Sequence, residues 1–133
     1  MQSTQSTQHP SPQHPMDDFE VRPLDFDIAD LQSQDCVWSD SAPHFAVFIN
    51  ALGVHVPYFE RYLIRTMNTV KHQVEAPVLR RDMVALTGQE GHHARNFIAV
   101  NKLLAQRYPK LEKMDETAKA YFAKAGKKDS QKR

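Results

Sequence analysis

The sequence lacks the features that mark a membrane or secreted protein. It has no run of about eighteen apolar residues, and its N-terminus lacks the basic and apolar blocks of a signal peptide. It also has a single cysteine, Cys36, which excludes an internal disulfide framework and is typical of a reducing compartment. We therefore predict no membrane span and a cytoplasmic location.

The sequence also has no excess of positive or negative charge. The 17 lysines and arginines nearly balance the 16 aspartates and glutamates, which leaves a net charge of +1. Nucleic-acid binding through phosphate contacts needs a basic surface, and no stretch combines basic and aromatic residues as the common modules do. We expect no nucleic-acid partner. At 133 residues with 41% hydrophobic content, the chain can form one modest domain but not two.

The chain divides into two tails and one central domain. Residues 1–18 repeat Gln-Ser-Thr and Gln-His-Pro units, which predicts a disordered, low-complexity tail. Residues 19–125 are predicted to form a helical domain, and residues 126–133 a solvated basic tail. Within the domain, residues 19–38 alternate apolar and polar side chains only briefly, so we predict an extended arm over a helical core.

Helical periodicity begins after the arm. A helix start is expected at residues 39–43, where Ser or Asp can cap the first turn and Pro43 is tolerated within it. Gly53 and Pro57 interrupt the apolar pattern that follows, so a kink or short break is expected near His55.

Two further helices follow a short turn at residues 71–77. The first is long, reaching about Tyr108, and the next is expected to start near Asp115. One face of the long helix repeats at steps of three and four, and two ionisable residues interrupt its apolar pattern. The face comprises Leu79, Met83, Leu86, Glu90, His93, Phe97, Val100 and Leu104.

The ionisable pair has the spacing of a metal half-site. Glu90 and His93 stand three residues apart, so both side chains leave one helix face and can reach one metal ion. Bundle metalloproteins add a lone Glu from a preceding helix, and Glu60 fits because apolar residues follow it at helical spacing. Glu60 and Glu90 each lie fifteen residues from Glu75 in the turn, which predicts equal height on antiparallel helices.

A structural interpretation of the same residues stays open. Glu90 could pair with Arg61, Arg65 or Arg95 in a buried polar network, with His93 as a core histidine. His92 points away from this face. Gln89, Arg95 and Asn96 could orient the ligands, although polar flanks of a helix have the same pattern. If Glu90 lies on this apolar face in metal-free protein, its carboxylate is expected to be buried and to have a raised pKa, because desolvation and the charge of Glu60 both disfavour ionisation.

Several segments together resemble a known family. They are RPLDFDIADL, the single Trp38, FINALGVHVPYFERYLIR, APVLRRDM and LTGQEGHHARNFIAVNKLL. In order and spacing they resemble the first half of the predicted metal-dependent hydrolase family, over about residues 19–110. The resemblance implies a ferritin-like antiparallel helical bundle with a carboxylate and histidine metal centre. The family's acidic residue falls on Glu60, and its Gln-Glu-x-x-His segment on Gln89, Glu90 and His93.

Two departures from the family shape the functional hypotheses. Phe97 stands where members commonly have another histidine, and longer members resemble a duplicated arrangement of which this chain carries one half. We therefore expect a half-bundle that a homodimer completes, with two lone carboxylates and two Glu-x-x-His motifs around one axis.

The predicted cofactor is a divalent metal ion. Oxygen-rich ligands favour iron or manganese, with zinc as an alternative. The first hypothesis is a metal-dependent hydrolase acting on an unidentified small molecule, although a di-iron centre could also run oxidation. The second is a non-catalytic helical oligomerisation module, or a truncated family member that retains half of a metal site.

Overall fold

The computed structural model describes residues 20–130, so the predicted tail at residues 1–18 lies outside it. The described elements are all helical, which confirms the all-α fold class. None of these helices is long and apolar enough to cross a membrane. The elements are η1 (Ile28–Ser33), α1 (Pro43–Val70), η2 (Lys71–Gln73), α2 (Pro77–Arg107) and α3 (Leu111–Ser130).

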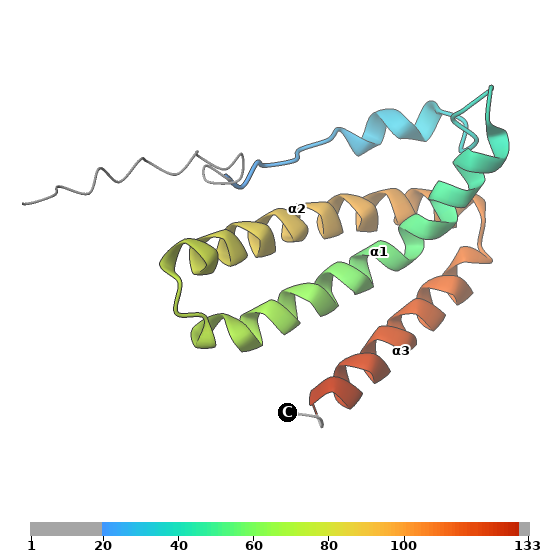
Figure 1. The fold of residues 1–133 in the computed structure, drawn as a ribbon. Coiled ribbons are helices and arrows are strands. Elements are labelled where there is room, and N and C mark those ends of the chain that lie inside the picture. Colours follow the sequence, from blue (N-terminus) through green and yellow to red (C-terminus); the bar gives the residue numbers. More distant parts are fainter. Residues whose placement is uncertain (1–19, 131–133) are drawn as a thin grey trace, which may run out of the picture.

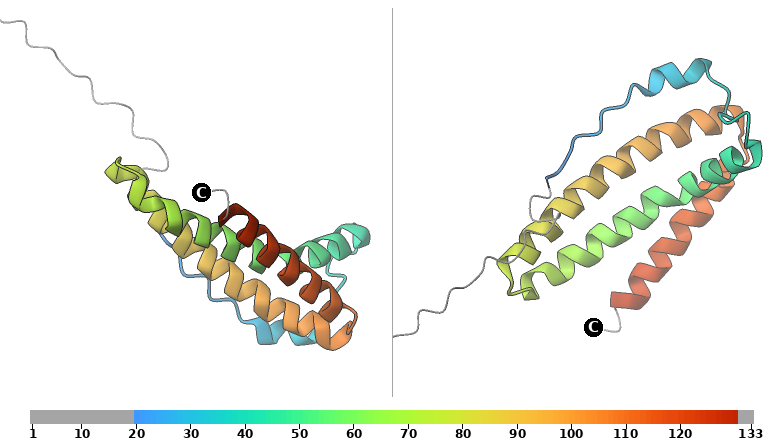
Figure 2. Two further views of the ribbon diagram at one scale, coloured as in Figure 1. Left: turned by 90° about the horizontal axis from the view of Figure 1, so that it is seen from below. Right: turned by 45° about the horizontal axis from the view of Figure 1, so that its top comes forward.

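The helices lie side by side. Figure 1 shows the N-terminal arm, α2, α1 and α3 in that order, and the right-hand view of Figure 2 shows the same order. The short turn around η2 makes α1 and α2 antiparallel neighbours, as the brevity of residues 71–77 predicts. The pairing of α1 with α2 therefore forms the centre of the domain.

The start of α1 differs in detail from the prediction. The helix begins at Pro43 as expected, because a proline in the first turn removes an N–H that has no helical partner. The capping residue is Ala42, and no side chain caps the helix. Ser39 instead accepts a hydrogen bond from the Ala42 N–H through its hydroxyl, at 3.2 Å. The prediction of a Ser or Asp cap is wrong.

Of the kink or short break expected near His55, the break does not occur, because α1 is continuous from end to end. Pro57 has no N–H to bond the Gly53 carbonyl one turn earlier. Asn101 of α2 donates its side-chain N–H to that carbonyl at 2.9 Å. The missing side chain of Gly53 also lets α2 approach closely, since a Cβ there would lie 3.4 Å from the Phe97 ring. Packing against α2 therefore supports the helix where its sequence is weakest.

The arm runs along α2 and is less extended than predicted, because it contains η1. Side chains of α2 hold its backbone. Gln89 accepts a hydrogen bond from the Arg22 N–H at 2.9 Å, and Asn96 donates one to the Leu24 carbonyl at 2.7 Å. The interpretation of Gln89 and Asn96 as polar flanks is therefore wrong.

The third helix starts earlier and ends later than the sequence indicates. It begins at Leu111, one turn before Asp115, and continues to Ser130. Most of the segment predicted as a basic tail is therefore helical.

Hydrogen bonds and aromatic contacts attach α3 to α1. The Tyr58 hydroxyl donates to the Asp115 carboxylate at 2.6 Å, and the Tyr62 hydroxyl donates to Asp129. The Phe122 ring lies 6.2 Å from that of Tyr62. Burial first, and then the hydrogen bond to Asp115, raises the pKa of Tyr58 to about 12. These contacts place α3 on the side of α1 that faces away from the arm (Figure 1).

Most of the buried apolar residues of the described domain have small side chains. Its buried apolar residues are Ala46, Val54, Ala94, Leu104 and Ala118. Large apolar side chains of α1 remain exposed and recur at helical spacing, so they form one apolar face along the helix. This apolar face of α1 comprises Phe45, Phe48, Leu52 and Phe59.

Candidate metal centre

The antiparallel helices bring the three predicted ligands together. Glu60 comes from the middle of α1, and Glu90 and His93 come from the middle of α2. One side-chain ligand atom from each residue lies within 4.8 Å of the other two. The equal helix height inferred from the turn is therefore confirmed.

One nitrogen of His93 faces both carboxylates. Its Nδ1 lies 3.3 Å from Glu90 Oε2 and 3.7 Å from Glu60 Oε1. A Glu and a His three residues apart on one helix share a face, which explains the first contact. The second requires the neighbouring helix, because Glu60 is distant in sequence. The three side chains therefore converge on one point between α1 and α2.

Burial differs sharply across the cluster. The side chain of Glu60 is 5% exposed, whereas those of Glu90 and His93 are 17% and 39% exposed. Burial, followed by the charge of Glu90, raises the pKa of Glu60 to about 7. From the periodicity of α2, we expected Glu90 to be a buried carboxylate with a raised pKa. The structure assigns both properties to Glu60.

One oxygen of Glu60 has no partner. Its Oε2 is buried and accepts no hydrogen bond within the described part of the chain. A buried carboxylate oxygen without a hydrogen bond costs free energy, so an ion or a proton is needed to compensate it. Two carboxylates and an imidazole are donors that suit divalent metal ions. The residues present therefore fit such an ion.

The arginines do not supply the compensation. Arg65 donates to the Arg61 carbonyl at 3.2 Å, and Arg95 lies 2.7 Å from the Nδ1 of His92. No arginine among residues 20–130 forms an ion pair with Glu90. The buried ion-pair network is therefore not formed, and His92 bonds outside the cluster as predicted.

Gln89 connects the cluster to the arm. It is buried, and its Nε2 donates to the Arg22 carbonyl at 3.3 Å and lies 3.4 Å from His93 Nε2. Groups that bond the outer nitrogen of a ligating histidine fix the orientation of its ring. Sequence periodicity missed this contact because Gln89 lies one residue off the predicted face. Its place in the Gln-Glu-x-x-His segment was the available signal.

Comparison with known proteins agrees with this geometry. The model of the family described as predicted metal-dependent hydrolase matches residues 20–133. The chain belongs to this family. The match extends past residue 110, where the resemblance in the sequence ended, and so includes α3. No curated protein and no solved structure matches the chain. Family membership and the donor set together support a divalent metal ion as cofactor.

Phe97 has a packing role in this family member. Its ring lies against Gly53, where the absence of a Cβ leaves room for it between α1 and α2. A residue four positions after His93 lies one turn further along the same face. The position where the family resemblance predicts another histidine is therefore used here for helix contact.

Proposed function

We propose that the protein is a metal-dependent hydrolase whose metal ion is held by Glu60, Glu90 and His93. The observation that carries the proposal is the buried, unpartnered oxygen of Glu60 beside Glu90 and His93. Iron or manganese suits these oxygen-rich ligands best, with zinc as an alternative. A metal ion in such a site activates water by lowering its pKa and polarises the bond to be cleaved.

Each residue has a distinct role in this proposal. Glu60 supplies a desolvated carboxylate, whose charge becomes favourable when a cation is bound beside it. Glu90 and His93 supply the other two protein ligands from one helix face. Gln89 is a positioning residue, because it contacts the outer nitrogen of the His93 ring. His93 is also the most exposed of the three ligands, so a substrate reaches the centre from its side.

The metal content of purified protein tests the proposal. After expression with iron and manganese, wild-type protein should carry at least about half an ion per chain. The Glu90→Ala, His93→Ala double variant should lose it. His92→Ala is the matched control, because His92 neighbours the centre but bonds to Arg95. Equal metal content in wild type and the double variant would contradict the proposal.

We also propose that two copies complete a ferritin-like centre. One copy supplies one lone carboxylate and one Glu-x-x-His motif, which is half of the ligand set of a two-metal bundle. A two-fold axis supplies the other half. The exposed apolar face of α1 supports association of two copies, because large apolar side chains left in water favour burial against a partner.

The same apolar face favours a second candidate function, a helical oligomerisation module without catalysis. Exposed apolar stripes of this kind usually mark association surfaces. The metal measurement separates the two functions, because a pure oligomerisation module associates without any metal.

A further inference from the structure

A groove lies between the arm and α2, next to the candidate metal centre. Its volume is about 470 Å³, within the range of small-molecule sites. We call it the arm groove. Most of its walls are apolar, with four residues from the arm and two from α2. They are Leu24, Phe26, Ile28, Leu31, Phe97 and Val100.

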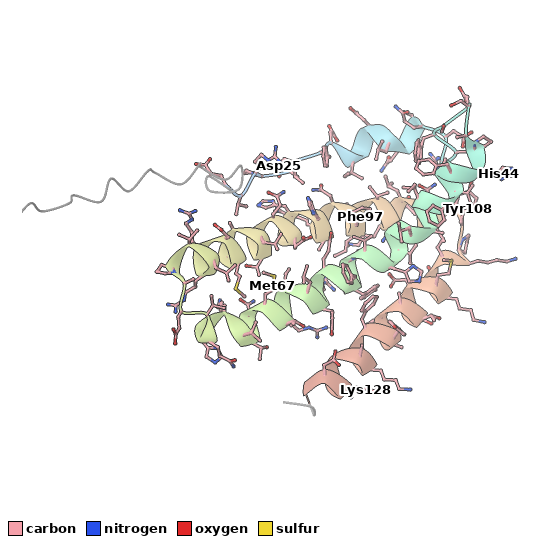
Figure 3. The ribbon with its side chains drawn as sticks, viewed as in Figure 1. Asp25, His44, Met67, Phe97, Tyr108 and Lys128 are labelled. Atoms are coloured by element: carbon pink, nitrogen blue, oxygen red, sulfur yellow. The ribbon has the colours of Figure 1, made fainter. Side chains whose placement is uncertain are left out.

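The arm forms a fixed wall of this groove because hydrogen bonds from α2 hold the arm at both ends of the groove. Asn96 bonds the Leu24 carbonyl at one end, and Arg107 donates to the carbonyls of Gln32 and Gln34 at the other. The segment between these attachments runs along α2 and includes η1. Figure 3 shows Asp25 on this arm beside α2 and Phe97 further along that helix. The hydrogen bonds use the arm's backbone, which leaves its apolar side chains to line the groove.

The groove reaches the metal centre through His93. This residue lines the groove and also lies within 3.7 Å of Glu60. Its side chain is the exposed member of the cluster, whereas Glu60 is buried behind it. A molecule in the arm groove therefore touches the side of the centre from which a substrate can approach.

The charges around the groove restrict its ligand. Asp27 and Asp30 line it, and no lysine or arginine among residues 20–130 does. Bringing an anion against two aspartates and an apolar wall is unfavourable, since desolvation and repulsion both oppose it. The groove therefore favours an uncharged ligand with a hydrocarbon or aromatic group.

We propose that the arm groove binds the apolar group of an uncharged ester or amide substrate, with the reacting carbonyl beside His93. This inference rests on the proposed hydrolase function. In the reaction, the oxygen of water bonds to the carbonyl carbon and the bond to the alcohol or amine breaks. The leaving group takes a proton from the water, which yields a carboxylic acid and an alcohol or amine.

Binding of a neutral fluorescent probe, Nile red, to the chelator-treated full chain tests the groove without requiring activity. Leu31→Asp and Val100→Asp place a charge in opposite walls and should each weaken binding about tenfold or more. Leu31 is already partly exposed on the arm, so its replacement leaves the helical core intact. Val84→Asp is the matched control, because Val84 is an exposed valine of α2 that does not line the groove.

The expected result is weaker binding in the two groove variants and unchanged binding in the control, with helicity preserved by circular dichroism. Equal binding in all variants overturns the proposal. A second experiment tests the effect of charge with an anionic probe, anilinonaphthalene sulfonate. The Asp27→Asn, Asp30→Asn double variant should bind this anionic probe at least roughly 3-fold more tightly than wild type does. No change there overturns the restriction to uncharged ligands.

Metal analysis of the same variants separates this proposal from the function on which it rests. Leu31→Asp should keep its metal content, because Leu31 is not a candidate ligand. Protein that carries metal but binds Nile red equally in every variant overturns the groove alone. Protein whose groove variants lose Nile red, but which never carries metal, overturns the hydrolase proposal and leaves an apolar binding site.

Discussion

Asn101 on α2 donates a hydrogen bond to the Gly53 carbonyl on α1, at the position where Pro57 leaves that carbonyl without a helical partner. The two helices are therefore joined through a backbone group close to the candidate centre, since Pro57 precedes Glu60 by less than one turn. The Asn101 side chain of α2 replaces the hydrogen bond that α1 lacks, and this contact fixes how the two helices align.

Removing this bond should destabilise the fold more when the proline is present than when it is absent. Asn101→Ala leaves the Gly53 carbonyl without a partner and should cost about 1–3 kcal/mol of unfolding free energy. Pro57→Ala returns a backbone N–H to that carbonyl. In that background Asn101→Ala should cost about 1 kcal/mol less, measured by urea unfolding of all four proteins. Strict additivity would show that the carbonyl does not depend on Asn101.

The raised pKa of Glu60 predicts how stability depends on pH in chelated protein. The pKa rises from an ordinary value of 4.5 to about 7, so the folded state holds a proton that the unfolded state has lost. Stability is fully present below the unfolded value and is lost as pH rises through the folded value. We expect unfolding free energy to fall between about pH 4.5 and pH 7.

Glu60→Gln should remove most of this loss. The variant should be more stable than wild type at pH 8, on the order of 2 kcal/mol, because it carries no buried charge. The exposed Glu75→Gln in the turn is the control and should retain the wild-type profile. Denaturant unfolding with chelator at pH 5 and pH 8 measures the difference. Parallel profiles for wild type and Glu60→Gln would contradict the burial of Glu60.

Two glycines of α2 should respond differently to alanine. A Cβ at Gly91 meets nothing within 4 Å, so Gly91→Ala should stabilise the protein by about 0.5–1 kcal/mol through helix propensity. A Cβ at Gly88 would lie 2.9 Å from Val21 of the arm. Gly88→Ala should therefore stabilise the protein less than Gly91→Ala does, because the arm must shift to make room for the new methyl group. Thermal unfolding of the two variants makes the comparison, and equal gains would show that Val21 does not pack there.

The dimer prediction concerns mass and the apolar face of α1. Light scattering should report about twice the chain mass of 15.3 kDa for wild type. Phe48→Glu places a charge on the exposed face and should shift the protein toward the monomer. Tyr121→Glu, at an exposed aromatic of α3, is the control. A monomer that still binds metal tightly would instead indicate a site with one metal ion.

Much of the centre could be predicted from the sequence because it depends on local geometry. The three-residue spacing of Glu90 and His93 sets their shared face, and the short turn sets their height relative to Glu60. The depth of each carboxylate could not be predicted in this way. It depends on contacts between segments distant in sequence, whereas the periodicity of α2 alone predicted only that Glu90 is buried with a raised pKa.

The errors have a common cause in long-range contacts. Where a kink or short break is predicted near His55, the helix does not break, because Asn101, distant in sequence, bonds the carbonyl that Pro57 leaves free. Gln89 and Asn96 resembled polar flanks because their partners are backbone atoms of the arm, which have no sequence signature. Local patterns locate a helix face, but they do not show which backbone groups lie opposite it.

The position of Gln89 makes the arm a reporter of the metal centre. A single amide side chain bonds the Arg22 backbone on one side and lies against the His93 ring on the other. Any ligand that turns this ring must also change the free energy of arm attachment, and by linkage arm attachment changes the affinity for that ligand equally. Exchange of the Arg22 amide hydrogen would therefore record metal binding in a segment that contributes no ligand.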